Sequence, residues 1–342
     1  MAEAVAERSR AANDRQGEAV AGVVAAHQRG LANPQSMDEL ETRAREALAL
    51  LEDVEDHAGL VHVWVALADV ANHPCRFEDE AHAAEQAMLH ARRIGRPGVF
   101  RLPHALVLGP RPADEALATL LPLLADDPHP SPRLWVAMLL TMLGRVDEAW
   151  DIAQEASRQL GELTGDDRGE MLLGWIATIA GDHESAARSR RIVCDRLEKQ
   201  GNRNVLSTCA PELGRSLCML GQYDEAEPLA QLGRELGDEQ DAATQMLWRQ
   251  VQALVWSHRG QHEEAERMAR EAVAIAEGTD ALIWQGDALC DLAEVLRSAG
   301  RLQEAVTILE QALERYERKR NLPMAAQIRQ RLGASEDSVP LA

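Results

Sequence analysis

The chain has 342 residues, of which 46% are hydrophobic, so its composition is that of a folded rather than an intrinsically disordered protein. Only 3% are aromatic, which disfavours an all-β sandwich or barrel because strands are enriched in aromatic residues. Acidic residues outnumber basic ones by 56 to 36, and the net charge of −20 repels polyanions, so we expect neither nucleic acid nor a membrane surface as a partner.

A six-residue pattern, Gly-x-x-x-(Glu/Ser)-Ala, recurs through the second half of the chain, and its glycines are Gly144, Gly181, Gly221, Gly260 and Gly300. Apolar residues spaced by three and four lie on both sides of each copy, which indicates two amphipathic helices. Glycine in the left-handed conformation ends the first helix, and an acidic residue suits the first turn of the second. Each copy therefore predicts a helical hairpin, with the recurring alanine where the two helices approach most closely.

In chain order, these signals predict eight helix pairs at 3–54, 57–95, 98–126, 130–163, 166–201, 203–237, 239–278 and 281–320. A capping helix at 322–332 and a flexible tail at 333–342 follow. The repeats are degenerate over 1–126 and well formed over 130–320, and no stretch has the alternation of a strand. The turns rich in Pro and Gly are too short for inter-domain linkers, so we expect residues 1–342 to form one continuous solenoid.

The last unit carries the spacing of a known repeat, with Leu289, Leu292, Gly300 and Ala305 at signature positions. On these residues the chain resembles the tetratricopeptide family. The resemblance implies an all-α fold, a right-handed α-α superhelix of about eight helix pairs with a C-terminal capping helix.

The longer period, near 40 residues, and the helices rich in Ala and Arg over 260–332 suggest a second resemblance. They are similar to the C-terminal repeat region of bacterial regulators that combine a STAND-type ATPase with a LuxR-type DNA-binding domain or a class III cyclase. This implies a module that senses a ligand or partner and restrains an attached effector. The chain contains no Gly-x-x-x-x-Gly-Lys-(Ser/Thr) motif, so we expect no ATP bound by a P-loop.

In tetratricopeptide arrays the first helix of each pair lines the concave groove. Counting back from each glycine, the candidates for groove binding are Met138, Met171, Trp175, Arg215, Gln250, Glu294 and Arg297. Such a mixture of sulfur, aromatic and polar groups suits a peptide or a small apolar ligand. The alternative is that several of them, above all Trp175 and the methionines, pack against the next repeat.

Other side chains give no pattern that indicates catalysis, a cofactor or a metal. Zinc would need three or four converging ligands, and the spacings place no pair one helical turn apart among His57, His62, His73, His82, His90 and Cys75. The carboxylates are expected on solvated helix faces, and no Gly-x-Ser-x-Gly nucleophile elbow is present. The basic clusters at 188–196 and 315–331 are expected to be ion-paired surface.

The five cysteines are odd in number, scattered and without a Cys-x-x-Cys pair, which indicates free thiols in a reducing cytoplasm. Cys209 and Cys218 are expected to lie in the core. The first ten residues lack the apolar stretch of a secretory signal. Arginine supplies nearly all the positive charge, because Lys199 and Lys319 are the only lysines, which is typical of a GC-rich bacterial genome.

The function we expect is a non-catalytic module that binds a protein, a peptide or a small ligand within a cytoplasmic bacterial signalling or transcriptional regulator. Two alternatives stay open. One is a small-molecule-binding protein or enzyme that uses the superhelix channel, and the other is a peptide-pheromone sensor.

Overall fold

The computed structural model describes residues 2–32, 36–96, 98, 100–125, 129–164 and 168–336, and within these ranges it contains eighteen helices and no strand. The chain divides into two compact units, which we call the N-terminal unit (Met1–Gly109) and the C-terminal unit (Pro110–Ala342). The boundary falls inside the predicted pair 98–126. That the repeats of both units continue one solenoid stays a proposal.

The N-terminal unit holds six helices: α1 (Ala2–Ala11), α2 (Arg15–Ala32), α3 (Met37–Asp53), α4 (His57–Asn72), α5 (Phe77–Arg93) and α6 (Leu102–Leu108). The pair predicted at 57–95 is α4 and α5. The pair predicted at 3–54 is wrong, because Asn13 takes a left-handed backbone conformation (φ 61°) and folds α1 back onto α2, so three helices occupy that range. Asparagine tolerates this conformation better than most residues, so no glycine marks the turn.

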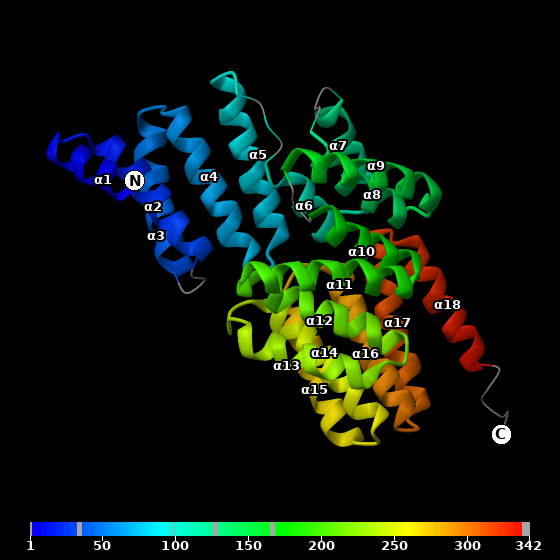
Figure 1. The fold of residues 1–342 in the computed structure, drawn as a ribbon. Coiled ribbons are helices and arrows are strands. Elements are labelled where there is room, and N and C mark those ends of the chain that lie inside the picture. Colours follow the sequence, from blue (N-terminus) through cyan, green and yellow to red (C-terminus); the bar gives the residue numbers. More distant parts are fainter. Residues whose placement is uncertain are drawn as a thin grey trace. The chain divides into compact units, whose positions relative to one another are not determined.

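The C-terminal unit holds twelve helices, shown in Figure 1 from green to red. They are α7 (Ala113–Leu124), α8 (Ser131–Met142), α9 (Val146–Thr164), α10 (Arg168–Ala180), α11 (His183–Gln200), α12 (Arg203–Met219), α13 (Tyr223–Leu236), α14 (Ala242–His258), α15 (His262–Glu277), α16 (Leu282–Ser298), α17 (Leu302–Lys319) and α18 (Leu322–Glu336). The five pairs from α8 to α17 match the predicted ranges. The last helix is longer than predicted and includes 333–336 of the expected tail, and the remaining tail residues lie outside the described ones.

The repeat pattern has the structural role that its residue types predict. The five glycines have φ between 75° and 81°, the left-handed conformation that ends the first helix of each pair: Gly144, Gly181, Gly221, Gly260 and Gly300. The alanines that follow are fully buried except Ala305, which is 5% exposed: Ala149, Ala186, Ala226, Ala265 and Ala305. These glycines and buried alanines confirm the hairpin prediction. A small side chain is needed at the alanine positions because the two helices of each pair pack closely there.

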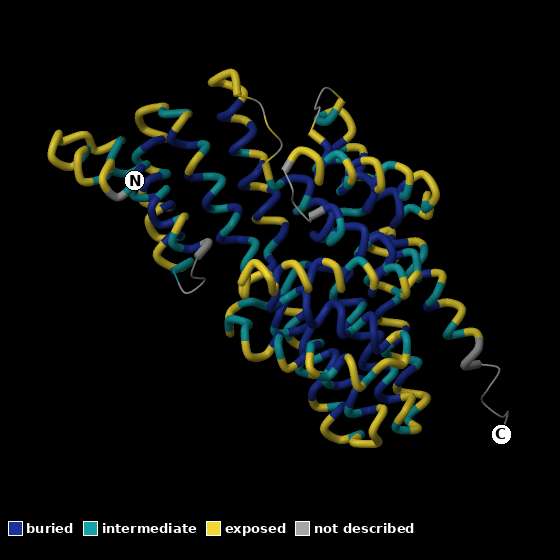
Figure 2. The backbone as a smooth tube through the Cα atoms, viewed as in Figure 1, coloured by how far each residue is buried: buried dark blue, intermediate teal, exposed yellow. Residues whose placement is uncertain are grey.

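Burial follows the helix faces that meet inside each unit, as Figure 2 shows. All five cysteines are buried and free, so the prediction that Cys209 and Cys218 are core thiols is confirmed. Burial raises the pKa of Cys194, Cys218 and Cys290 to about 12, so these thiols stay protonated. Among the described helices, none is both long and apolar enough to cross a membrane.

Candidate functional site

The first helices of successive pairs in the C-terminal unit share a face that is joined across the array. The Arg215 guanidinium on α12 donates from Nε to Asp291 Oδ2 (2.7 Å) and from Nη2 to Asp291 Oδ1 (3.0 Å) on α16. One side chain thus spans helices two pairs apart, past α14, which requires the array to curve toward this side. We call it the inner face. The residues of the first helices bonded across it are Trp175, Glu212, Arg215, Gln250, Asp287 and Asp291, and the helical spacing of three or four residues adds Met171, Glu294 and Arg297.

Arg215 is the centre of a polar network on this face. Gln250 Nε2 donates to Asp291 Oδ2 (2.9 Å), and Asp287 Oδ2 lies 3.6 Å from Arg215 Nη1. Tyr316, fully buried on α17, donates its hydroxyl to Asp287 Oδ1 (2.7 Å). Burial opposes the charge on Arg215, but Asp287 and Asp291 outweigh it and raise the pKa of this guanidinium above its ordinary value. The positive charge that holds the network together is therefore permanent.

A second network joins α10, α11 and α12 around Glu212. Trp175 Nε1 donates to Glu212 Oε1 (2.9 Å), and Arg190 Nε lies 3.6 Å from Glu212 Oε2. Arg190 Nη1 also donates to Thr178 Oγ1 (2.7 Å) and Ser216 Oγ (2.6 Å). Burial raises the pKa of Glu212, although Arg190 and the indole N–H oppose that shift. The hydrogen bond to Glu212 thereby holds the indole ring of Trp175 in one orientation.

The seven groove candidates differ in accessibility. Met138 and Gln250 are each 1% exposed and offer no surface to a partner. Met171 and Trp175 are half-buried and one helical turn apart on α10, so they share a face. Glu294 accepts from Arg297 Nε (3.0 Å), and both remain open to solvent on α16. The structure unites Arg215 and Gln250 through Asp291, and it buries Met138.

Sequence reasoning missed the acidic side of this site. Asp287, Asp291 and Glu294 recur at i, i+4 and i+7 on α16, which places them on one helical face. That spacing could have indicated an acidic helix face, but it does not stand out in a sequence with 56 acidic residues. The Glu212 side chain, 7% exposed, had no signal at all.

Two basic residues expected at the surface are buried, so the prediction of ion-paired surface is wrong for Arg190 and Lys319, which are 7% and 0% exposed. Lys319 lies at the end of α17, where its Nζ donates to the backbone oxygen of Arg111 (2.7 Å). Next to it, Arg320 pairs with Asp114 (2.8 Å) at the beginning of α7. The end of the C-terminal unit therefore contacts its beginning.

The N-terminal unit has its own chain of charged groups. His27 Nε2 lies 2.6 Å from Asp69 Oδ2, and Arg101 joins Asp69 (2.9 Å) to the fully buried Glu80 (2.6 Å). His104 Nδ1 lies 2.9 Å from the same Glu80 carboxylate. These contacts tie α2, α4, α5 and α6 together, which is a structural role.

Histidines of this unit also meet, since His57 Nδ1 lies 3.1 Å from His90 Nδ1. No group of three or more potential metal ligands occurs among the residues that the structure describes.

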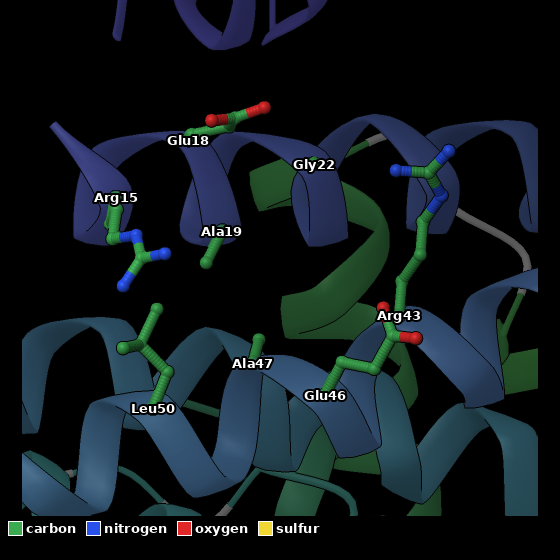
Figure 3. A pocket seen from close by; sticks show the side chains of 8 residues that line it. All are labelled: Arg15, Glu18, Ala19, Gly22, Arg43, Glu46, Ala47 and Leu50. Atoms are coloured by element: carbon green, nitrogen blue, oxygen red, sulfur yellow. The ribbon is translucent and has the colours of Figure 1, made fainter. Parts of the chain in front are cut away.

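A cleft of about 310 Å³ lies between α2 and α3, and Figure 3 shows its lining. Ala19 and Ala47 face each other across it, and Arg15 extends toward Leu50. The volume is at the lower limit for small-molecule sites, and half of the lining residues are charged. The lining residues are Arg15, Glu18, Ala19, Gly22, Arg43, Glu46, Ala47 and Leu50.

A family model described as tetratricopeptide repeat matches residues 242–318, which form α14 to α17. Over these two helix pairs the chain is similar to tetratricopeptide repeats. The same hairpin geometry, with its left-handed glycines and buried alanines, extends over the pairs from α8 onward. No match to the chain is found among curated proteins.

Solved structures with tetratricopeptide-like folds resemble the chain at low identity. A chain of the APC/C hetero-tetramer Cut9-Hcn1 is 15% identical with a TM-score of 0.59, covering 86% of this chain and 53% of its own length. The protein thus spans about half of that relative. TTC0263, a tetratricopeptide protein of Thermus thermophilus, is 20% identical (TM-score 0.42, covering 60% and 98%). NprR, solved with its cognate peptide NprX, is 14% identical (TM-score 0.49, covering 88% of each chain). Likeness at this identity shows the fold alone.

Proposed function

We propose that the C-terminal unit is a non-catalytic module that binds a protein or peptide on its inner face. The observation that carries the proposal is the character of that face. It combines a half-buried methionine and tryptophan on α10, Met171 and Trp175, with the charged pair Glu294 and Arg297 on α16, the first helix three pairs further along the array. Aromatic and thioether groups supply apolar contact, and flanking charges supply orientation.

The fold supports the same proposal. Tetratricopeptide hairpins stack so that one helix of each pair faces inward, which creates an extended surface rather than a single deep pocket. Such surfaces recognise segments of polypeptide through several side chains in succession. Catalysis needs convergent groups with matched proton affinities, and the inner-face carboxylates are instead bound to Arg215, Gln250 and Tyr316.

We further propose that the module belongs to a cytoplasmic bacterial regulator, in which binding changes the curvature of the array and so acts on an effector. The five free thiols and the strong preference for arginine over lysine support this setting. The link to STAND-type ATPases rests on the long repeat period and stays part of the proposal.

Peptide selection tests the binding function. Peptides selected from a random library on the immobilised chain should bind with micromolar Kd. Met171→Ala, on the inner face, should weaken them at least tenfold. Ile192→Ala removes a side chain of similar size from α11, where it is 41% exposed, and should leave the affinity unchanged. Recovery of no peptide, or equal affinity of both variants, would overturn the proposal.

A further inference from the structure

The last helix, α18, returns to the beginning of the C-terminal unit. It packs on α17, as the next helix of a solenoid does, but also contacts α8 and α10. In Figure 1 its first turns lie beside α10, and the rest runs on toward the C-terminus. Its Gln327 Nε2 lies 2.9 Å from the point where a Cβ on Gly181 would stand, directly after α10. The helix therefore bridges the first and last pairs of the unit.

The same helix reaches the inner face at Glu294. Arg331 Nη2 donates to Glu294 Oε2 on α16 (3.5 Å), and its charge also acts on Asp291 and Cys290 of that helix. Together with its contacts to α8 and α10, this bond makes α18 span from the beginning of the array to the Glu294 end of α16. A partner that binds at Glu294 would therefore meet α18 there.

This helix is only lightly attached. Among residues 322–333, Ala325 and Ile328 alone are buried, whereas α16 buries twelve of its residues. A terminal helix with so few buried contacts is among the segments that open most readily. A partner helix that replaced α18 would therefore displace little buried apolar contact.

The charge of the covered face indicates which helix fits there. Of the three carboxylates on α16, Asp287 and Asp291 are bound to Arg215, and Glu294 is the one to which α18 presents an arginine. The whole chain carries −20, so its field attracts cationic partners. A helix rich in Lys or Arg on one side and small or aliphatic residues on the other matches both features.

We propose that the inner face binds a basic amphipathic helix of a partner protein in exchange for α18. The inference rests on the proposed function and names its class of partner. The partner places a basic side chain at Glu294, as Arg331 does, and small and aliphatic residues where Ala325 and Ile328 lie. Because α18 is tethered to the same face, it lowers the apparent affinity of every competitor by the fraction of time that it is seated.

The first test releases α18 in the full chain. Ile328→Asp places a charge on the buried side of the helix, and Gln330→Asp makes the same charge change on its exposed side. A fluorescein-labelled peptide of residues 321–336 is the probe, measured by fluorescence anisotropy. We expect it to bind Ile328→Asp at least tenfold more tightly than wild type or Gln330→Asp. Equal affinity for all three proteins would overturn the proposal.

Circular dichroism would reveal whether Ile328→Asp unfolds the protein. If it does, a second test reverses the charges of the Arg331–Glu294 pair. The full-chain variant Arg331→Glu changes a half-exposed side chain and should also bind the probe at least tenfold more tightly than wild type. The peptide carrying Arg331→Glu should lose this affinity, and Glu294→Arg in the protein should restore it. Failure of the restoration would overturn the placement of α18 on α16.

Two further outcomes separate this inference from the proposed function. If library-selected peptides bind wild type and the released variants with equal affinity, exchange with α18 is refuted while the binding function stands. If the 321–336 peptide behaves as expected but no other peptide binds, the binding function is refuted. A wild-type dimer that exchanges α18, detected by light scattering, would make a second copy the occupant and overturn the proposed partner class.

Discussion

Gly286, on the side of α16 that faces α17, tests how tightly the repeats pack. A Cβ added there would lie 2.7 Å from Tyr316 Cζ and 2.8 Å from its Cε1. The ring is fully buried, and its hydroxyl donates to Asp287 Oδ1, so it has no free direction in which to move. Gly286→Ala must therefore shift the ring or strain α16.

The size of this destabilisation follows from one stabilising effect and two destabilising ones. Alanine in place of glycine inside a helix normally stabilises by about 1 kcal/mol. Overpacking costs about 1 to 3 kcal/mol, and weakening the hydrogen bond of the buried hydroxyl costs about 1 kcal/mol more. We expect Gly286→Ala to lower the free energy of unfolding by about 2 kcal/mol.

Urea denaturation followed by circular dichroism measures this change, and α9 offers a matched control. Gly161 is exposed and has no atom within 4 Å of its Cβ position, so Gly161→Ala should stabilise by up to about 1 kcal/mol through helix propensity. Opposite signs for two identical substitutions would confirm the packing. A Gly286→Ala protein as stable as wild type would refute the close contact between α16 and α17.

Three further predictions concern stability. Ala305→Asp should cost about 3 kcal/mol, because it places a charge and extra volume between α16 and α17, and an unchanged melting temperature would contradict its placement. Asp291→Ala should cost about 3 kcal/mol in urea denaturation, since it leaves the buried Arg215 with only a 3.6 Å contact to the Asp287 carboxylate and a 3.5 Å hydrogen bond to the Asp287 backbone oxygen, and a cost below about 1 kcal/mol would disprove the central role of this ion pair. Burial and then the neighbouring His57 lower the pKa of His90, so the unfolded chain binds the proton more readily and stability is lost as pH falls below about 6.5. The drop in melting temperature between pH 7.5 and 5.5 should therefore shrink in His90→Gln, and an equal drop would exclude this histidine as its cause.

The repeats could be predicted because their signals are local. A left-handed glycine and a buried alanine five residues later specify one hairpin without reference to the rest of the chain, and every pair from α8 to α17 follows. The turn at Asn13 escaped because its residue type does not demand the left-handed conformation that it takes. The first three helices were accordingly read as two.

The site was less accessible to sequence reasoning, because it depends on the curvature of the array. Arg215 and Asp291 are 76 residues apart, and nothing near either one indicates the other. Lys319 was placed at the surface with its basic neighbours, yet closure of the C-terminal unit buries it against the Arg111 carbonyl. Long-range contacts of this kind follow from the small rotation between repeats, summed over several pairs.

The central claim is that partners bind the inner face, and site-specific photo-crosslinking tests it most directly. Benzoylphenylalanine is placed at position 171, on the inner face, or at position 192, on the outer helix α11, and a library-selected peptide is added. Illumination should crosslink the peptide at 171 and not at 192. Crosslinking at 192 alone would contradict the account and place the binding surface on the outer helices.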